Sequence, residues 1–464
     1  MSEAGRFTWG AAASSYQIEG ATHEDGRGES IWDRFCTVPG KVRGGDSGAI
    51  ACDFYHRFRD DVRLMQELEI DAFRFSIAWP RVIPAGRGRV NEKGLDFYDR
   101  LVDELLAADL RPFVTLYHWD LPQALEDAGG WPSRDTAGAF AEYVEVVASR
   151  LGDRVLDWAT HNEPFCTSWL GYGYGVHAPG RTSAADAIAA AHHVLLSHGW
   201  AVDVLRRICA RAEVGIVLDS WPVHPFTDDP ADARVARLQD GTRNRWFFDP
   251  VFRGEYPPDI LEHFGRIVPP VLEGDLADVS VPLDFVGMNN YSRTLVRSGP
   301  DGEPLEVRAP SGSLTDMGWE VCPEALYEVL MRLHREYAAP SLYVTENGAA
   351  FADVRTHDGH IHDVERVGYL TAHVDAALRA AKDGAPLRGY FVWSLLDNFE
   401  WALGYSKRFG IVYVDYPTQE RVPKDSFYRF RELIREERRR YVNSRMSPLD
   451  EVTTIAGAQS AERD

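Results

Sequence analysis

Two glutamates, Glu163 and Glu346, stand out because each follows a short apolar run and has an asparagine beside it. Two carboxyl groups that face each other suit glycoside hydrolysis, in which one acts as an acid and the other as a base or nucleophile. Alternatively, each glutamate could simply cap a strand or form an ion pair. Because both lie in similar turns after predicted strands, the pair favours catalysis over two unrelated structural roles.

Further polar and aromatic residues follow the predicted strands. Amides and carboxylates match the hydroxyl groups of a sugar, and the flat faces of tryptophan match the apolar faces of a pyranose ring. The residues at these strand ends are Tyr16, Gln17, Glu19, Arg74, Trp79, Tyr117, His118, Trp119, Asp120, Asn162, Asn289, Asn290, Tyr291, Asn347, Gly348, Trp393, Glu400 and Trp401. If the strand ends share one rim, the sequence predicts a sugar-binding site there.

Eight short runs rich in apolar, β-branched or aromatic residues recur along the chain, mostly without strict alternation of apolar and polar residues. This pattern is typical of parallel strands that are covered on both faces. The predicted strands are residues 7–13, 72–77, 112–117, 156–160, 214–218, 285–289, 342–345 and 390–393. Helical spacing of apolar residues predicts helices between them, at residues 54–68, 95–106, 140–151 and 325–337,.

Eight strand–helix repeats with right-handed crossovers predict an α/β fold, the (β/α)8 TIM barrel, in which functional residues lie at the carboxyl ends of the strands. A doubly wound open sheet is the alternative, but it needs a glycine-rich phosphate turn after the first strand. The chain has Ser-Ser-Tyr-Gln-Ile-Glu-Gly there instead. Without an evident linker, the sequence predicts a single catalytic domain with long loops, residues 1–445, and a polar C-terminal tail, residues 446–464.

The acidic composition disfavours nucleic acid and anionic membranes as partners. Lys plus Arg number 50 and Asp plus Glu 71, so the formal net charge is −21, which repels phosphate groups. The five cysteines show neither metal-ligand nor disulfide spacing,. No apolar stretch is long enough to span a membrane, and the first ten residues lack the pattern of a secretory signal. These features predict a cytoplasmic protein; whether it forms a homo-oligomer is left open.

Five motifs, in the same order along the chain, resemble those of glycoside hydrolase family 1, the β-glucosidases and their relatives. They are residues 7–20, 73–81, 160–164, 343–348 and 393–405. The resemblance extends from about residue 7 to about residue 440. It implies the barrel fold already predicted from the strands and a retaining, exo-acting β-glycosidase that needs no metal or organic cofactor.

The resemblance also implies roles for individual residues. Glu163 would be the general acid/base and Glu346 the nucleophile. The residues implied to hold the non-reducing sugar are Gln17, His118, Asn162, Tyr291, Trp393, Glu400 and Trp401. The residues implied to support the site are Arg74 and Asn289, which with Tyr291 surround the nucleophile, Trp319 on the aglycone side, and Phe409 in the loop after the last strand.

The electrostatics of such a pair predict which carboxyl group carries the proton. The carboxyl groups of a retaining glycosidase lie about 5–5.5 Å apart, and two anions that close are costly. Arg74 and the hydroxyl of Tyr291 would stabilise Glu346 as an anion and leave the proton on Glu163. After Glu346 is esterified, the pKa of Glu163 would fall and the group could deprotonate water.

The family contains enzymes for plain glycosides and enzymes for 6-phosphoglycosides, and three positions distinguish them. Here these positions hold Glu400, Lys407 and Phe409. Only Lys407 fits the phosphate pattern, whereas the Glu400 carboxylate would repel a phosphate and could accept hydrogen bonds from O4 and O6 hydroxyls. We therefore expect neutral substrates, small β-glucosides and short cello-oligosaccharides, with β-galactosidase or β-fucosidase side activity.

Two alternatives to a β-glucosidase remain to be weighed. A non-catalytic sugar-binding barrel is disfavoured because both glutamates are present, and a thioglycosidase typically has glutamine where this chain has Glu163. The family usually has Asn-Tyr-Tyr where this chain has Asn289, Asn290 and Tyr291, which puts local packing in question. Cys166, close to Glu163, is expected to be a small buried residue and not a nucleophile.

Overall fold

Eight parallel strands close into a barrel. The computed structural model describes residues 7–309 and 312–458. Around the barrel the strand order is β1-β11-β10-β7-β5-β4-β3-β2. The strands are β1 (Thr8–Ala12), β2 (Ala72–Ser76), β3 (Arg111–Tyr117), β4 (Asp157–Asn162), β5 (Glu213–Asp219), β7 (Phe285–Asn289), β10 (Leu342–Asn347) and β11 (Leu387–Trp393). Each of the eight predicted strands overlaps one of these, and the predicted (β/α)8 fold is confirmed.

The interior of the barrel is filled by a cluster of buried side chains to which each strand contributes. Its members on the eight strands include Ala12, Ala72, Phe113, Ala159, Val217, Phe285, Tyr343 and Phe391. Phe113 lies at the centre, with its ring 5.2 Å from the rings of Phe285 and Phe391. Because small residues stand beside large ones, these side chains fill the interior of the barrel.

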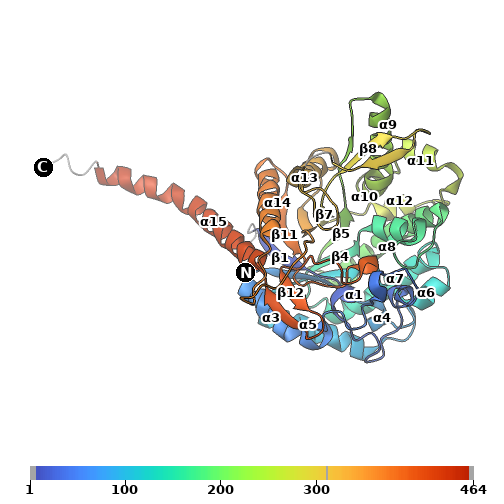
Figure 1. The fold of residues 1–464 in the computed structure, drawn as a ribbon, viewed down its shortest axis with the longest axis horizontal. Helices are drawn as coiled ribbons and strands as arrows, with labels where there is room; N and C mark the ends of the chain where they lie inside the picture. The colour runs from blue at the N-terminus through green and yellow to red at the C-terminus, as the bar shows by residue number, and fades with distance from the viewer. Residues whose placement is uncertain (1–6, 310–311, 459–464) are drawn as a thin grey trace.

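Helices surround the barrel (Figure 1). The longer ones are α3 (Phe54–Leu68), α5 (Glu92–Ala107), α7 (Arg134–Leu151), α8 (Ala184–Ile208), α13 (Pro323–Tyr337), α14 (Val364–Lys382) and α15 (Asp425–Ala458). Short helices in the loops are α1 (Ser15–Ile18), α2 (Ile31–Cys36), α4 (Trp79–Val82) and α6 (Gln123–Asp127). The four predicted helices correspond to α3, α5, α7 and α13, and each buries the apolar stripe that predicted it.

The connection between β5 and β7 contains structure that the sequence analysis did not predict. It includes α9 (Pro230–Asp240), η3 (Gly241–Arg245), α10 (Trp246–Arg253), α11 (Pro258–Phe264) and α12 (Asp275–Val279). A small sheet of β6 (Val223–Pro225), β8 (Thr294–Ser298) and β9 (Pro304–Val307) lies with α9 beside the barrel (Figure 1). These elements lie at one side of the barrel mouth. They bring Arg243, on η3, next to Asp219 at the end of β5.

The last helix, α15, begins against the barrel and extends away from it (Figure 1). Its first turns are buried, with Phe427 and Phe430 fully covered. The helix continues to Ala458, so most of the segment predicted as a polar tail is helical. The predicted boundary at residue 445 stays a prediction.

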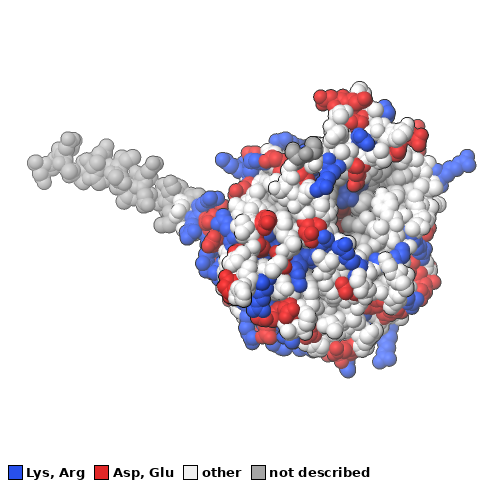
Figure 2. All heavy atoms as spheres, viewed as in Figure 1, with Lys and Arg blue, Asp and Glu red and all other residues white. Residues whose placement is uncertain are grey.

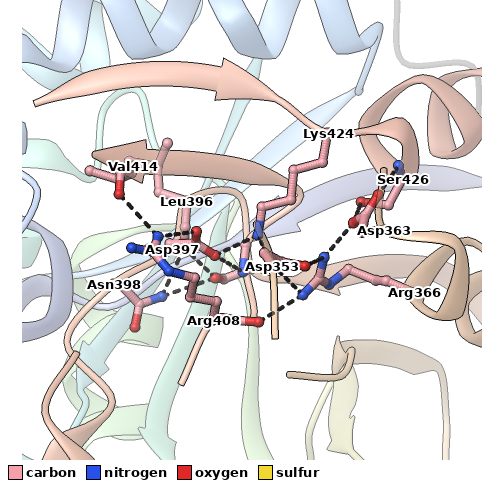
Figure 3. A network of polar contacts seen from close by, with 12 residues as sticks. Asp353, Asp363, Arg366, Leu396, Asp397, Asn398, Arg408, Val414, Lys424 and Ser426 are labelled. Carbon is pink, nitrogen blue, oxygen red and sulfur yellow. Dashed lines mark hydrogen bonds and ion pairs between the residues drawn. The ribbon is translucent and has the colours of Figure 1, made fainter. Parts of the chain in front are cut away.

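A network of six charged side chains joins the loops after β10 and β11 to the segment before α15 (Figure 3). Its members are Asp353, Asp363 and Asp397 with Arg366, Arg408 and Lys424. The ammonium group of Lys424 is fully buried, lies 2.7 Å from Asp397 Oδ1 and also contacts Asp353. Three carboxylates thus meet three cations, and this balance fixes the loop that follows β11 to the rest of the barrel.

The surface carries interspersed charges. On the face drawn in Figure 2, blue and red side chains alternate around a hollow of uncharged residues. Among the described helices, none combines the length and apolar character that a membrane span requires.

Replacing Lys424 with Met should strongly destabilise the fold, because the carboxylates of Asp353 and Asp397 would stay buried without their shared cation. Removing one partner of a buried ion pair costs about 3–5 kcal/mol. The free energy of unfolding from urea titration measures the effect. As a matched control, Arg379→Met breaks a half-exposed pair with Glu324 and should cost about 0–1 kcal/mol. Equal losses in the two variants would contradict this account of the network.

Candidate active site

A pocket of about 220 Å³ opens at the carboxyl ends of the strands. Both predicted catalytic glutamates line it, Glu163 directly after β4 and Glu346 within β10. Other predicted site residues on its wall are His118, Tyr291, Trp319, Trp393, Glu400, Trp401 and Phe409. The structure therefore brings together residues from the whole length of the chain at one rim of the barrel.

Glu163 is held by contacts on both of its carboxyl oxygens. Asn289 Nδ2 donates to Oε1 at 2.7 Å, and the thiol of Cys166 donates to Oε2 at 3.0 Å. Its backbone has a φ of +49°, and its N–H bonds to the carbonyl of Val217 on β5. A non-glycine residue in this left-handed region is uncommon, and here it turns the chain out of β4 so that the carboxyl group faces the pocket.

Glu346 has different partners, one of them a cation. Arg74 Nη1 lies 2.6 Å from Oε1, and the hydroxyl of Tyr291 donates to Oε2 at 2.6 Å. The Arg74 guanidinium is fully buried and also donates from Nη2 to Asn162 Oδ1 at 2.7 Å. Asn289 contacts both glutamates and so links the two halves of the pair.

These environments separate the proton affinities of the two carboxyl groups. Burial raises the pKa of Glu163 well above its usual range, and the nearby carboxylates raise it further. Burial also raises the pKa of Glu346, but the charge of Arg74 and the hydroxyl of Tyr291 oppose that effect. Glu346 is thus the site of the negative charge and Glu163 the site of the proton. This is the assignment that the sequence analysis expected.

An aromatic and carboxylate wall faces the glutamates across the pocket. The ring of His118 is stacked with those of Trp393 and Trp401, each at a centroid distance of 5.9 Å. Burial and the nearby Arg74 lower the pKa of His118 well below its usual range, so the ring is neutral. Burial, with a contribution from Glu346, raises the pKa of Glu400 to about 8.

Two of the predicted sugar-binding residues lie behind the pocket wall. Gln17 is fully buried, and its Nε2 donates to Asn398 Oδ1 and to the carbonyl of Phe399, each at 3.0 Å. The side chain of Asn162 is held between Arg74 and His118. Both residues therefore position the groups on the wall, as do Arg74 and Asn289, and their direct contact with a sugar stays a prediction.

At the outer end of the pocket, aromatic residues surround Trp319. Its ring lies 5.1 Å from Trp221, 5.5 Å from Tyr291 and 6.0 Å from Phe409. Lys407 is paired with Asp316 at 2.8 Å and is not on the pocket wall. This end is an apolar slot, the kind of surface that a sugar face or an aryl group covers.

Comparisons with known proteins agree with this geometry. The model of glycosyl hydrolase family 1 matches residues 4–439. The chain belongs to glycosyl hydrolase family 1. It is 47% identical to β-glucosidase A of Thermotoga maritima, over 92% of this chain and 97% of that protein. It is 44% identical to a bifunctional β-D-glucosidase/β-D-fucosidase of Bifidobacterium breve, with the same two coverages.

The solved structures agree as well. A β-glucosidase from Thermotoga maritima in complex with glucoimidazole superposes with a TM-score of 0.91 at 47% identity, covering 92% of this chain and 98% of that one. Membership of family 1 confirms the predicted family and glycoside hydrolase activity. The doubly wound open sheet is excluded, because the described strands form a closed barrel.

The sequence analysis missed several residues that line the pocket beside Glu163 and Glu346. Asp219 ends β5, a barrel strand for which no site residue was predicted, and Arg243 and Trp221 lie in the following connection. Cys166 is buried as expected, but its thiol contacts Glu163. Asn290, the departure from the family pattern, turns away from the pocket and donates to the carbonyl of Ser220 at 2.7 Å. The polar end of β5 was a usable signal; the rest depends on tertiary structure.

Glu163, Cys166 and Asp219 could in principle offer three donor atoms to a metal ion, all within 4.8 Å of one another. Burial, however, raises the pKa of the Cys166 thiol well above its usual range, and a neutral thiol is a poor ligand. The cation of Arg243 is 2.7 Å from Asp219 and would repel a second cation. The donor set therefore fits a hydrogen-bonded acid better than a metal site.

Replacing Tyr291 with Phe should move the acidic limb of the kcat/KM profile to higher pH by about one unit. The hydroxyl stabilises the ionised form of Glu346, so its loss raises the pKa of that carboxyl group. The basic limb should stay nearly in place. Tyr143→Phe is the matched control, since its buried hydroxyl donates to the backbone carbonyls of Ile77 and Leu116 and contacts neither glutamate. An unchanged acidic limb in Tyr291→Phe would contradict the assignment of Glu346.

Proposed function

We propose that this family 1 enzyme is a retaining, exo-acting β-glucosidase in which Glu346 is the nucleophile and Glu163 the acid/base. The observation that carries the proposal is the unequal environment of the two carboxyl groups. Arg74 and Tyr291 contact Glu346, whereas Glu163 is held by an amide and a thiol. One ionised and one protonated carboxyl group at one pocket are what double displacement requires.

In the first step Glu346 Oε attacks the anomeric carbon while Glu163 transfers its proton to the departing glycosidic oxygen. The products are the free aglycone and a glucosyl ester of Glu346. The ester carries no charge, so the repulsion that Glu346 exerted on Glu163 is lost. Glu163, now ionised, takes a proton from water while the water oxygen attacks the anomeric carbon. The bond to Glu346 breaks, β-glucose is released, and Glu346 is again a carboxylate and Glu163 again protonated.

The shape of the pocket supports action at the end of a sugar chain. The buried side chains around Phe113 fill the barrel interior beneath the pocket, and Trp393, Glu400 and Trp401 form one wall of the pocket. A single terminal sugar enters such a pocket, with the aglycone toward Trp319. We assign the contacts of that sugar to His118, Tyr291, Trp393, Glu400 and Trp401, with Gln17 and Asn162 as supporting or direct partners.

The names of relatives support the substrate class. A 1,4-β-D-glucan glucohydrolase of Thermotoga neapolitana is 46% identical over 92% of this chain and 97% of that protein, which favours short cello-oligosaccharides beside small β-glucosides. The Bifidobacterium enzyme favours a β-fucosidase side activity. This substrate class also favours a role in cellulose breakdown. The cytoplasmic location stays a prediction of the sequence, and the oligomeric state stays open.

Replacing Glu346 with Ala should abolish hydrolysis of an aryl β-glucoside, because no nucleophile remains to form the ester. Added azide or formate should partly restore turnover by attacking in its place. A product of inverted anomeric configuration, identified by proton NMR, would show that the small anion has replaced the carboxylate. Hydrolysis at the unmodified rate in Glu346→Ala would exclude the proposed mechanism.

The enzyme should prefer a plain glucoside to its 6-phosphate ester. Glu400 faces the pocket, and Lys407, the residue that could bind phosphate, is already paired with Asp316. Competing kinetics on nitrophenyl β-D-glucoside and its 6-phosphate measure the ratio of kcat/KM, which we expect to exceed about tenfold. Among the described residues, the cations at the pocket, Arg74 and Arg243, are already paired with carboxylates, so a buried phosphate would have no cation to balance its charge, which accounts for at least this factor. A preference for the phosphorylated substrate would contradict the assignment of Glu400.

A further inference from the structure

Asp219, at the end of β5, is a buried carboxyl group to which the double displacement assigns no role. Its side chain is 5% exposed and lines the pocket on the side of Glu163. Oxygen atoms of Asp219 and Glu163 and the sulfur of Cys166 lie within 4.8 Å of one another. A third carboxyl group therefore lies beside the acid/base, and its cation is not Arg74, which contacts Glu346.

Asp219 has its own cation. Arg243 Nη2, on η3, donates to Asp219 Oδ2 at 2.7 Å. The guanidinium of Arg243 packs over the ring of Phe165 at 4.2 Å and lies 5.4 Å from that of Trp221. These contacts fix the cation on Asp219. When two neighbouring carboxyl groups share one proton, the group with the cation ionises, so Asp219 carries the charge and Glu163 the proton.

We propose that Asp219, paired with Arg243, is a positioning residue that keeps the transferable proton on Glu163 in the free enzyme. The proposal rests on the function proposed above, in which Glu163 is the acid. Asp219 touches neither reacting atom in this scheme; it acts through the charge that it places next to Glu163.

The charges around Glu163 support this role. Burial raises its pKa most, Asp219 next and Glu346 third. The other titratable groups facing this part of the pocket are Arg74, which is paired with Glu346, neutral His118, the Tyr291 hydroxyl, Glu400 and the neutral thiol of Cys166. Two of the carboxyl groups at the pocket pair with a cation, Glu346 with Arg74 and Asp219 with Arg243. Of these two, Asp219 is the one that is not the nucleophile.

Asp219 also has a consequence for the second half of the reaction. Esterification neutralises Glu346, but Asp219 keeps its charge throughout the cycle. Glu163 therefore loses only one of the two anions that raise its pKa. Its pKa falls enough for it to act as a base, yet stays higher than in a pocket whose only other anion is the nucleophile.

The test is the pH profile of the Asp219→Asn variant. Asparagine has the same shape, and its amide oxygen can still accept from Arg243, so the fold should be kept. Loss of the charge lowers the pKa of Glu163, and the basic limb of kcat/KM should move to lower pH by about one unit, the scale for a unit charge within ~5 Å. Arg243 is present in both proteins and does not offset this change. The acidic limb should move less.

The substrate provides a readout that a purely structural role would not move. A nitrophenyl glucoside needs the acid more than a dinitrophenyl glucoside, whose phenolate departs unaided. The shift of the basic limb should therefore be clear with the first and weak with the second. A uniform loss of kcat/KM on both substrates, without a shift, would mean that Asp219 only anchors η3 through Arg243 and would overturn the proposal.

Three further variants complete the experiment. Asp240→Asn is the matched control, because Asp240 precedes η3 and pairs with Arg245 and Arg332 but does not line the pocket; its basic limb should stay in place. Glu163→Gln should lose that limb altogether. If Glu163→Gln keeps the limb, the proposed function fails; if it loses the limb while Asp219→Asn leaves it unmoved, only the present proposal fails. Asp219→Ser serves as a second uncharged variant should the asparagine protein be unstable.

Discussion

Glu163 and Glu346 are buried at one end of the barrel, where burial opposes the ionised form of both carboxyl groups. Only one of them can be an anion at low cost, and the fully buried guanidinium of Arg74 decides which one, because it contacts Glu346 at 2.6 Å,. Asn162 and Asn289 complete the arrangement by bonding to Arg74, to each other and to Glu163. The chemistry depends on this contrast between two residues of the same type.

The barrel makes the difference between Glu163 and Glu346 possible, because it fixes the strand on which each of their partners lies. Arg74 lies on β2, Asn162 on β4, Asn289 on β7 and Glu346 on β10, and the closed parallel barrel turns the carboxyl ends of these strands to the same side. The loop that carries Glu400 and Trp401 has no such register. The buried network around Lys424 holds that loop instead, and Asn398 connects it to Gln17. Thus the strands position the reacting groups, and an ion-pair network positions one wall of the sugar pocket.

The strands and the reacting pair could be predicted from the sequence because both follow local rules. A fully covered parallel strand is apolar on both faces, and the residues just after it lie at the active rim. The connection between β5 and β7 could not be predicted this way, because its short elements are stabilised by packing against the rest of the protein. Asp219 and Cys166 show the same limit. Their importance lies in a contact with Glu163 that neither sequence spacing nor composition contains.

The charges of the whole pocket also bear on the form in which Glu400 would meet a sugar. Among the described residues, the carboxyl groups on the wall are Glu163, Asp219, Glu346 and Glu400, whereas the nearby cations are Arg74 and Arg243. Each cation pairs with one carboxylate, so the other two groups have no cation to balance their charge. Burial raises the pKa of all four groups, but Arg74 and Arg243 oppose the rise for Glu346 and Asp219. Glu163, the proton donor, and Glu400, with a pKa of about 8, lack this opposing charge. In the free enzyme, a pKa of about 8 favours the carboxylic acid form of Glu400 at neutral pH. It can donate one hydrogen bond to a sugar hydroxyl and accept another, where an ionised carboxylate could only accept.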